Sequence, residues 1–214
     1  MKIVIIGATG KTGTELTTQA LAAGHTVVAY VRRPEAIAPT PGITVVGGQL
    51  DDSNRLEAAL EGCDAVIVTL GPKISDRNKP LLSFAIPAVI TAAQQAGVKR
   101  IVVLSALGVG ATMANTRYPY RLGAKTFLKG NFADHHAGES HLNDSELDWT
   151  TIHPGPLFNA EQTPQPTIVD AATGKKMPGS PRTMRADVAA TILGMLDEPT
   201  TYGKQMLVTS ATVR

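Results

Sequence analysis

Cysteine pairs, long apolar runs and an excess of charge of one sign are all missing from this sequence. Cys63 is the single cysteine, which excludes an intramolecular disulfide framework and a cysteine-rich zinc site. No apolar run approaches the roughly 18 residues that a membrane-spanning helix needs. The sequence has 20 basic and 18 acidic residues, and no stretch gathers the basic ones into the stripe typical of nucleic-acid binders. The sequence therefore predicts a protein whose partners include neither a membrane nor a nucleic acid.

The rest of the composition is that of an ordinary globular protein. Hydrophobic residues make up 43% and charged residues 18% of 214 residues, a length typical of one sizeable domain. Residues 3–6 read directly as a buried strand, with no signal or transit peptide before them. We expect a single domain over residues 1–214 in a cytoplasmic protein, with Cys63 as a small core filler.

Strand-like and helix-like segments alternate along most of the chain. Continuous apolar runs at 3–6, 26–31, 43–46, 65–70 and 100–104 predict strands buried on both faces. Helices are expected over 12–23, 53–61, 81–96 and much of 131–145, with a strand at 149–153. Gly24 and Ser53 are the expected caps of the first two helices, and Pro87 either kinks the third or marks its first turn. This order predicts an α/β fold with a doubly wound, mainly parallel Rossmann-like sheet.

The regular pattern weakens after residue 153. Residues 154–182 contain six prolines and predict a small, loop-rich region on the substrate side of the sheet. A helix over 185–196 and a strand over 205–209 are expected to close the fold.

A glycine-rich turn between the first strand and the first helix is the strongest functional signal. Glycines without side chains let the backbone approach a pyrophosphate, and the N-terminus of the following helix offers free N–H groups to it. The strand before it and the helix after it supply the context that a dinucleotide site requires. The predicted cofactor-binding residues of this turn are Gly7, Thr9, Gly10, Lys11, Thr12 and Gly13.

The end of the second strand distinguishes the two nicotinamide cofactors. NAD-preferring sites usually place a carboxylate here, whereas this strand ends in Arg32 and Arg33. A guanidinium can bind a 2′-phosphate through two charge-assisted hydrogen bonds, so the sequence favours NADP(H). The alternative is that both arginines are merely solvated.

Two further segments follow strands at the same predicted edge. Asp51 is the better candidate to contact the adenine after the third strand, although Asp51 or Asp52 could instead cap the next helix. Leu70, Gly71 and Pro72 end the fourth strand, where a bound dinucleotide would cross the sheet.

Several segments together resemble one family. GATGKTG at 7–13, VRRPE at 31–35, GGQLDD at 47–52 and VVLSALG at 102–108 resemble the atypical short-chain dehydrogenases of the NAD(P)-binding NmrA-like type. Within that type, the sequence is most similar to the flavin reductase/biliverdin-IXβ reductase-like branch. LDWTTIHPGPL at 147–157 and MRADVAATIL at 184–193 fit the same pattern, so the resemblance spans nearly the whole chain.

The resemblance implies an NADPH-dependent oxidoreductase with an open cleft above the nicotinamide. Ser105 corresponds by position to the family's active-site serine, and Asp134-His135 to a short polar motif. His153 departs from the family, because many relatives have arginine before the Pro-Gly pair.

The tyrosine–lysine pair of ordinary short-chain dehydrogenases is absent. None of the four tyrosines is followed by lysine four residues later. A ketone becomes a basic alkoxide and needs a positioned acid, whereas flavins and quinones delocalise the added electron pair. The sequence therefore favours a conjugated acceptor, with Ser105 as an orienting donor to acceptor or cofactor. Tyr118 and Tyr120 complete the predicted catalytic set because they follow Ser105 in a long loop at the cleft.

The histidines predict no metal site. His135 and Glu139 lie one helical turn apart, but His136 and His141 fall on other faces, so we interpret all four as a solvated polar helix surface. Two alternatives to a reductase stay open: a non-catalytic NADP(H)-binding redox sensor that acts through a protein partner, and an epimerase/dehydratase-like isomerase.

Overall fold

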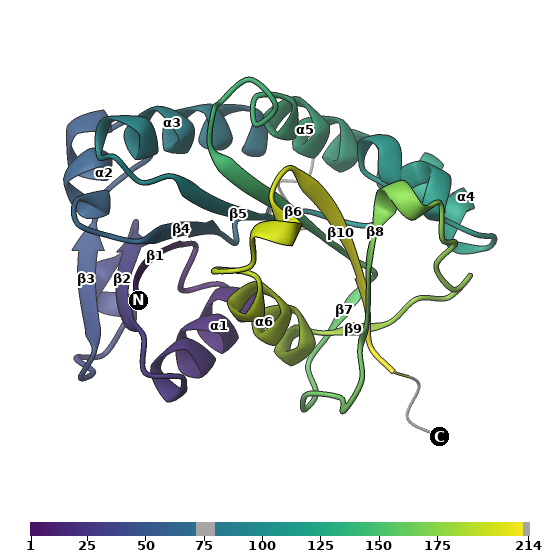
Figure 1. The fold of residues 1–214 in the computed structure, drawn as a ribbon, viewed down its shortest axis with the longest axis horizontal. Helices are drawn as coiled ribbons and strands as arrows, with labels where there is room; N and C mark the ends of the chain where they lie inside the picture. The colour runs from purple at the N-terminus through teal and green to yellow at the C-terminus, as the bar shows by residue number, and fades with distance from the viewer. Residues whose placement is uncertain (72–79, 212–214) are drawn as a thin grey trace.

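The computed structural model describes residues 1–71 and 80–211, and a twisted parallel sheet forms its centre (Figure 1). Eight strands of the described residues follow the order β3-β2-β1-β4-β5-β6-β10-β8, with β8 antiparallel to β10. A two-stranded pair, β7-β9, forms a separate sheet that contacts β10. The strands are β1 Lys2–Ile6, β2 Thr26–Val31, β3 Ile43–Gly47, β4 Ala65–Val68, β5 Arg100–Leu104, β6 Asp148–Pro154, β7 Leu157–Phe158, β8 Thr167–Asp170, β9 Thr183–Met184 and β10 Lys204–Thr209.

Helices cover both faces of the sheet. Figure 1 shows α2, α3 and α5 above the sheet, with α1 and α6 below it and α4 beyond the β8 edge. Alternate residues of β1 enter separate cores: Val4 and Ile6 pack under α2 and α3, whereas Ile3 and Ile5 pack against α1 and α6. The helices are α1 Lys11–Ala22, α2 Ser53–Leu60, α3 Leu82–Gln95, α4 Tyr120–Lys125, α5 Lys129–Ser140 and α6 Arg185–Gly194.

The predicted fold class is confirmed, and the strands over 26–31 and 100–104 match to the residue. Gly24 adopts the left-handed conformation expected of a C-terminal cap, with φ of +80°. The predicted cap at Ser53 is wrong, and the alternative cap at Asp52 is confirmed, because Asp52 Oδ1 accepts a hydrogen bond from the Arg55 N–H at 3.1 Å. Pro87 lies inside α3 rather than in its first turn. Helix α5 begins two residues earlier and ends five residues earlier than predicted.

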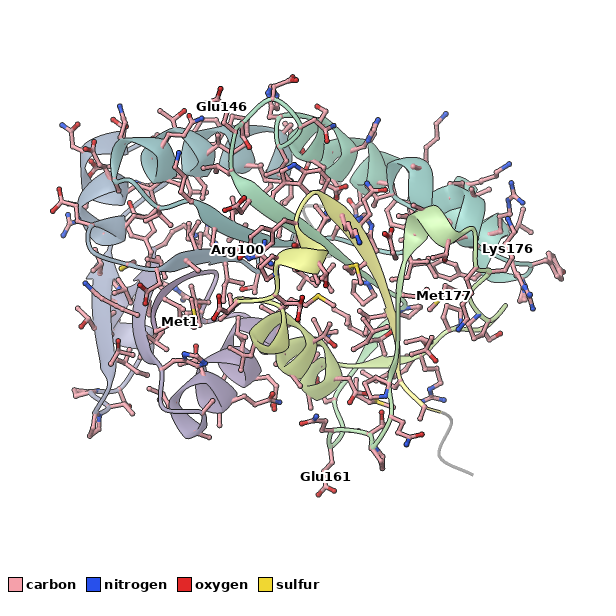
Figure 2. All side chains as sticks on the ribbon, viewed as in Figure 1. Met1, Arg100, Glu146, Glu161, Lys176 and Met177 are labelled. Carbon is pink, nitrogen blue, oxygen red and sulfur yellow. The ribbon has the colours of Figure 1, made fainter. Side chains whose placement is uncertain are left out.

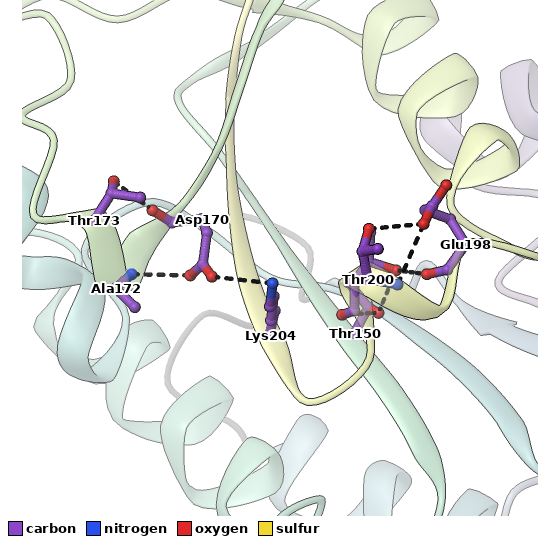
Figure 3. A network of polar contacts seen from close by, with 8 residues as sticks. Thr150, Asp170, Ala172, Thr173, Glu198, Thr200 and Lys204 are labelled. Atoms are coloured by element: carbon purple, nitrogen blue, oxygen red, sulfur yellow. Dashed lines mark hydrogen bonds and ion pairs between the residues drawn. The ribbon is translucent and has the colours of Figure 1, made fainter.

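The region 154–182 is loop-rich as predicted, but it also contributes an edge strand that the sequence did not reveal. Thr167–Asp170 forms β8, which pairs antiparallel with β10. Lys204 Nζ lies 3.7 Å from Asp170 Oδ2 across this pair, as Figure 3 shows. Four residues directly after Pro166 are too short a run for apolar periodicity to identify.

A buried arginine joins the start of β5 to the end of α6. Arg100 lies in the interior, near the middle of the molecule in Figure 2. Its guanidinium donates to the carbonyls of Leu196, Met195 and Asp148 at 3.1, 2.7 and 2.6 Å. Carbonyls at a helix C-terminus lack partners within the helix, and a cation stabilises them. Burial lowers the pKa of Arg100 to about 10, so the side chain stays charged at neutral pH.

No helix within 1–71 or 80–211 is long and apolar enough to cross a membrane.

Candidate functional site

The glycine-rich turn leaves β1 at the middle of the sheet, between β2 and β4. Gly7 has φ of +94°, which favours glycine, and its carbonyl accepts a hydrogen bond from the Gly10 N–H at 2.9 Å. A side-chain carbon at Gly13 would lie 2.2 Å from the Gly7 carbonyl oxygen, so no larger residue fits there without movement of the turn. The turn therefore brings bare backbone to the sheet edge at the point where the strand order reverses, the usual ligand position in such folds.

The N-terminus of α1 has no side-chain cap. Gly10 caps the helix without a side chain, and no acidic residue lies in the first turn. Thr9, Gly10 and Lys11 are exposed, so their backbone and side chains are open to a ligand. The Thr12 side chain is buried, which limits it to contacts through its main chain. Unpaired N–H groups at a helix N-terminus suit a phosphate.

The polar residues predicted on the neighbouring strands reach the same sheet edge. Arg32 and Arg33 follow β2 and are exposed, and β2 runs parallel to β1 with Tyr30 beside Ile6. Asp51 is exposed beyond β3.

The residues beyond β4 have a more mixed placement. Leu70 is half-buried and Gly71 is exposed. Pro72 lies outside the described residues. The positions of Leu70 and Gly71 are compatible with a dinucleotide laid across the edge, and the individual contacts stay predictions.

Ser105 follows β5 and makes a buried contact that the sequence did not suggest. Its side chain is only 5% exposed, and its hydroxyl donates a short hydrogen bond to Glu139 Oε1 of α5. The Ser105 N–H donates to the Ile152 carbonyl at 2.8 Å, which fixes the residue beside β6. Glu139 Oε2 lies 3.8 Å from His153 Nε2.

His153 is completely buried behind this pair. Its Nε2 lies 2.8 Å from Thr151 Oγ1, and its Nδ1 lies 3.0 Å from the Ala106 carbonyl oxygen. A ring nitrogen beside a carbonyl must carry hydrogen, so the Nδ1–H tautomer satisfies these contacts. Histidine here thus holds the loop after β5 in place.

The two ionisable groups near Ser105 are both shifted towards their neutral forms. Burial raises the pKa of Glu139 to about 7, and the hydrogen bond from Ser105 opposes that rise only in part. Burial lowers the pKa of His153 to about 4. Near neutral pH the site therefore contains an uncharged imidazole and a carboxyl group that is protonated in about half of the molecules.

The interpretation of His135 and Glu139 as solvated is wrong. Their side chains are 8% and 6% exposed, because α5 lies against the sheet and packs closely on α3. A side-chain carbon at Gly138 would lie 2.4 Å from the Leu82 carbonyl oxygen, which shows how near the helices are. The spacing of Phe132, His135 and Glu139 marks the inward face, a signal that the sequence carried.

Helix α5 is also anchored by a carboxylate that caps a different helix. Asp134 accepts hydrogen bonds from the N–H groups of Leu81, Leu82 and Ser83 at 2.9–3.1 Å and from the Ser83 hydroxyl at 2.7 Å. Burial opposes ionisation of Asp134, but these hydrogen bonds outweigh it and lower its pKa. The cap binds α3 to α5 and so fixes the helix that carries Glu139.

The two predicted tyrosines occupy different environments. Tyr118 is 77% exposed at the surface. The Tyr120 hydroxyl donates to the Leu107 carbonyl at 2.7 Å, and burial raises its pKa to about 12. That hydroxyl holds the loop after Ser105 and is a weak proton donor, while the catalytic role of either tyrosine stays a prediction.

A cleft of about 790 Å³ opens beside the glycine-rich turn. Thr9 and Lys11 line one side, and Asn159 and Arg185 line the other. The Arg185 guanidinium donates to Asn159 Oδ1 at 2.6 Å, which joins α6 to the loop after β7. Figure 2 shows Glu161, another lining residue, at the tip of that loop. The volume is within the range of small-molecule sites.

Comparisons with known proteins agree with this geometry. A family model described as NAD(P)H-binding matches residues 7–199. The uncharacterized sugar epimerase YhfK of Bacillus subtilis (strain 168) is 32% identical over 211 residues, which cover 95% of this chain and 92% of YhfK.

Two solved structures share the fold at low sequence identity. A short-chain dehydrogenase/reductase from Veillonella parvula DSM 2008, in complex with NADP, has a TM-score of 0.83 at 17% identity, covering 99% of this chain and 95% of its own. ChuY, an anaerobillin reductase from Escherichia coli O157:H7, has a TM-score of 0.81 at 24% identity, covering 100% and 99%.

Binding of NAD(P)H thus accounts for the glycine-rich turn, the free helix N-terminus and the strand order. The predicted NAD(P) cofactor is confirmed at the level of the family. The chain belongs to the NAD(P)H-binding family, with the Rossmann-like fold of the NmrA and epimerase type.

Proposed function

We propose that this protein is an NADPH-dependent oxidoreductase that transfers hydride to a conjugated acceptor such as a flavin or a quinone. The observation that carries the proposal is the polar centre beside β5, where Ser105 contacts Glu139 and no tyrosine–lysine pair exists. A centre with a weak hydroxyl donor suits an acceptor that delocalises the incoming electron pair, since such an acceptor needs positioning more than strong acid catalysis.

The residues around the turn fit the cofactor. Gly7, Gly10 and Gly13 would accommodate the pyrophosphate at the N-terminus of α1, and the exposed Arg32 and Arg33 would bind the 2′-phosphate of NADPH. When bound, the reduced nicotinamide supplies the hydride. Ser105 would orient the acceptor through its hydroxyl.

The test is steady-state oxidation of NADPH with a panel of free flavins and quinones. We expect turnover above the background rate of free flavin, and a marked loss of kcat in Ser105→Ala. The matched control is Ser140→Ala, because the Ser140 hydroxyl lies on the exposed side of α5 and donates to the Ala137 carbonyl. Cofactor binding without turnover of any acceptor would refute the reductase and favour the redox sensor.

The similarity to YhfK supports an epimerase as the second candidate. An epimerase that oxidises and re-reduces its own substrate must retain the cofactor between the two steps. NADP(H) that co-purifies with the protein and resists dialysis would therefore favour this function over the reductase.

A further inference from the structure

One stripe of helix α5 carries buried polar atoms that have no hydrogen-bond partner in residues 1–71 and 80–211. Asn131 Oδ1, His135 Nδ1 and Glu139 Oε2 are buried and lack a hydrogen-bond partner among the described residues. The three residues are spaced four apart, so they share one side of the helix. Buried polar atoms without partners are rare in folded proteins, and a catalytic role is one physical reason to keep them.

The stripe faces the end of β5. Glu139 contacts the Ser105 hydroxyl from this side, and it also lies beside His153 of β6. His135 and Glu139 are each more than nine-tenths buried. The stripe therefore adjoins the residue that the family resemblance places at the active site.

We propose that Glu139 holds the proton that replaces the one Ser105 transfers to the acceptor during reduction. This inference rests on the proposed function and adds to it a source for the second hydrogen. Glu139 acts through Ser105, so it is a positioning residue that also holds a proton, whereas Ser105 contacts the acceptor.

The step balances in atoms and charge. The acceptor would take a hydride from bound NADPH, leaving NADP⁺, together with the proton of the Ser105 hydroxyl. In its protonated form, Glu139 donates its Oε1–H to Ser105 Oγ, the reverse of the direction for the carboxylate, and Ser105 Oγ takes this proton as its own O–H bond breaks. Glu139 is left as a carboxylate, and it takes a proton from water after the product leaves.

The surroundings of Glu139 suit a reversible proton store. Ser105 faces it from β5, His153 from β6 and His135 from its own helix, while Asp134 points away to cap α3. Neither lysine nor arginine forms an ion pair with Glu139 in the described part of the chain. Among the described residues no cation holds it ionised, and burial raises the pKa of this carboxyl to about 7.

Glu139→Gln tests the proposal, because glutamine keeps the shape and removes the acid. With a quinone acceptor, kcat should fall about 10²-fold, the lower range for loss of general acid catalysis. The wild-type kcat should decline as pH rises through about 7, and the variant should lack this decline. The Kd for NADPH, measured by calorimetry, should be unchanged. Glu61→Gln, an exposed glutamate beyond α2, is the matched control.

An infrared titration provides a readout that does not need turnover. The wild type should show a protonated carboxyl band that disappears as pH rises through about 7, and Glu139→Gln should lack it. If Glu139→Gln fails to fold, Ser105→Ala should shift this band while it lowers kcat. A band that titrates in the ordinary glutamate range, or an unchanged pH profile in the variant, would overturn the proposal.

The two proposals fail in different ways. NADPH binding without turnover of any acceptor would overturn both the reductase and the proton step. Turnover that is indifferent to Glu139→Gln would overturn the proton store alone.

Discussion

The raised pKa of Glu139 makes the stability of the fold depend on pH, and Glu139→Gln measures that dependence. The pKa is about 7 in the folded protein against an ordinary value of 4.5. One pKa step corresponds to about 1.4 kcal/mol, so ionising Glu139 costs roughly 3 kcal/mol more in the folded protein than in the unfolded chain.

Proton binding decides whether the stability of the fold rises or falls with pH. The folded state keeps the proton on Glu139 where the unfolded chain has lost it, so stability is full below pH 4.5 and falls as pH rises to about 7. His153 has the opposite slope, because its lowered pKa of about 4 removes stability as pH falls below the ordinary value of 6.5. This second slope is common to the wild type and the variant and cancels in their difference.

Glutamine cannot ionise, so the free energy of unfolding of Glu139→Gln should increase relative to that of the wild type as pH rises. We expect the variant to be about 1 kcal/mol less stable near pH 4.5, because its hydrogen bond with Ser105 is weaker. Near pH 8 it should be about 2 kcal/mol more stable. Urea unfolding followed by the fluorescence of Trp149, the single tryptophan, measures both values. An equal difference at the two pH values would refute the assignment of a buried, neutral Glu139.

Three other predictions concern the cofactor site and the cap of helix α3. Gly13→Ala should weaken NADPH binding at least tenfold by calorimetry, because the added methyl would lie 2.2 Å from the Gly7 carbonyl oxygen. The control is Gly194→Ala, whose methyl meets no atom within 4 Å and should leave NADPH binding unchanged. Asp134→Ala should lower the free energy of unfolding by about 2–3 kcal/mol, since it leaves the N–H groups at the start of α3 unpaired; a loss below about 0.5 kcal/mol in urea titrations would contradict the cap. Arg32→Glu should reduce the ratio of NADH to NADPH dissociation constants by about tenfold or more, because a carboxylate repels the 2′-phosphate; an unchanged ratio would place that phosphate elsewhere.

Much of the fold was accessible from the sequence because its signals are local. The apolar run of β5 and the glycine after α1 identify their elements without knowledge of any distant residue. The glycine-rich turn is equally local, since Gly7, Gly10 and Gly13 act on one another within seven residues. For the same reason the family and its cofactor could be predicted together.

Contacts between distant segments were beyond the sequence. Asp134 caps a helix about 50 residues earlier in the chain, and β8 exists only because β10 offers it an edge. Neither partner has a periodicity that points to the other.

The candidate site likewise combines features with local sequence signals and features that depend on contacts between distant segments. The sequence by itself predicted a nucleotide site beside Gly7 and placed Ser105 at the end of the fifth strand, which the structure ends one residue earlier, at Leu104. Only the tertiary structure decided that Glu139, 34 residues further on, returns to Ser105 and is buried there. The physical reason is that burial belongs to the packed molecule: the same carboxyl on an exposed helix would be an ordinary acid, and the packing of α5 on α3 and the sheet makes it a store for a proton.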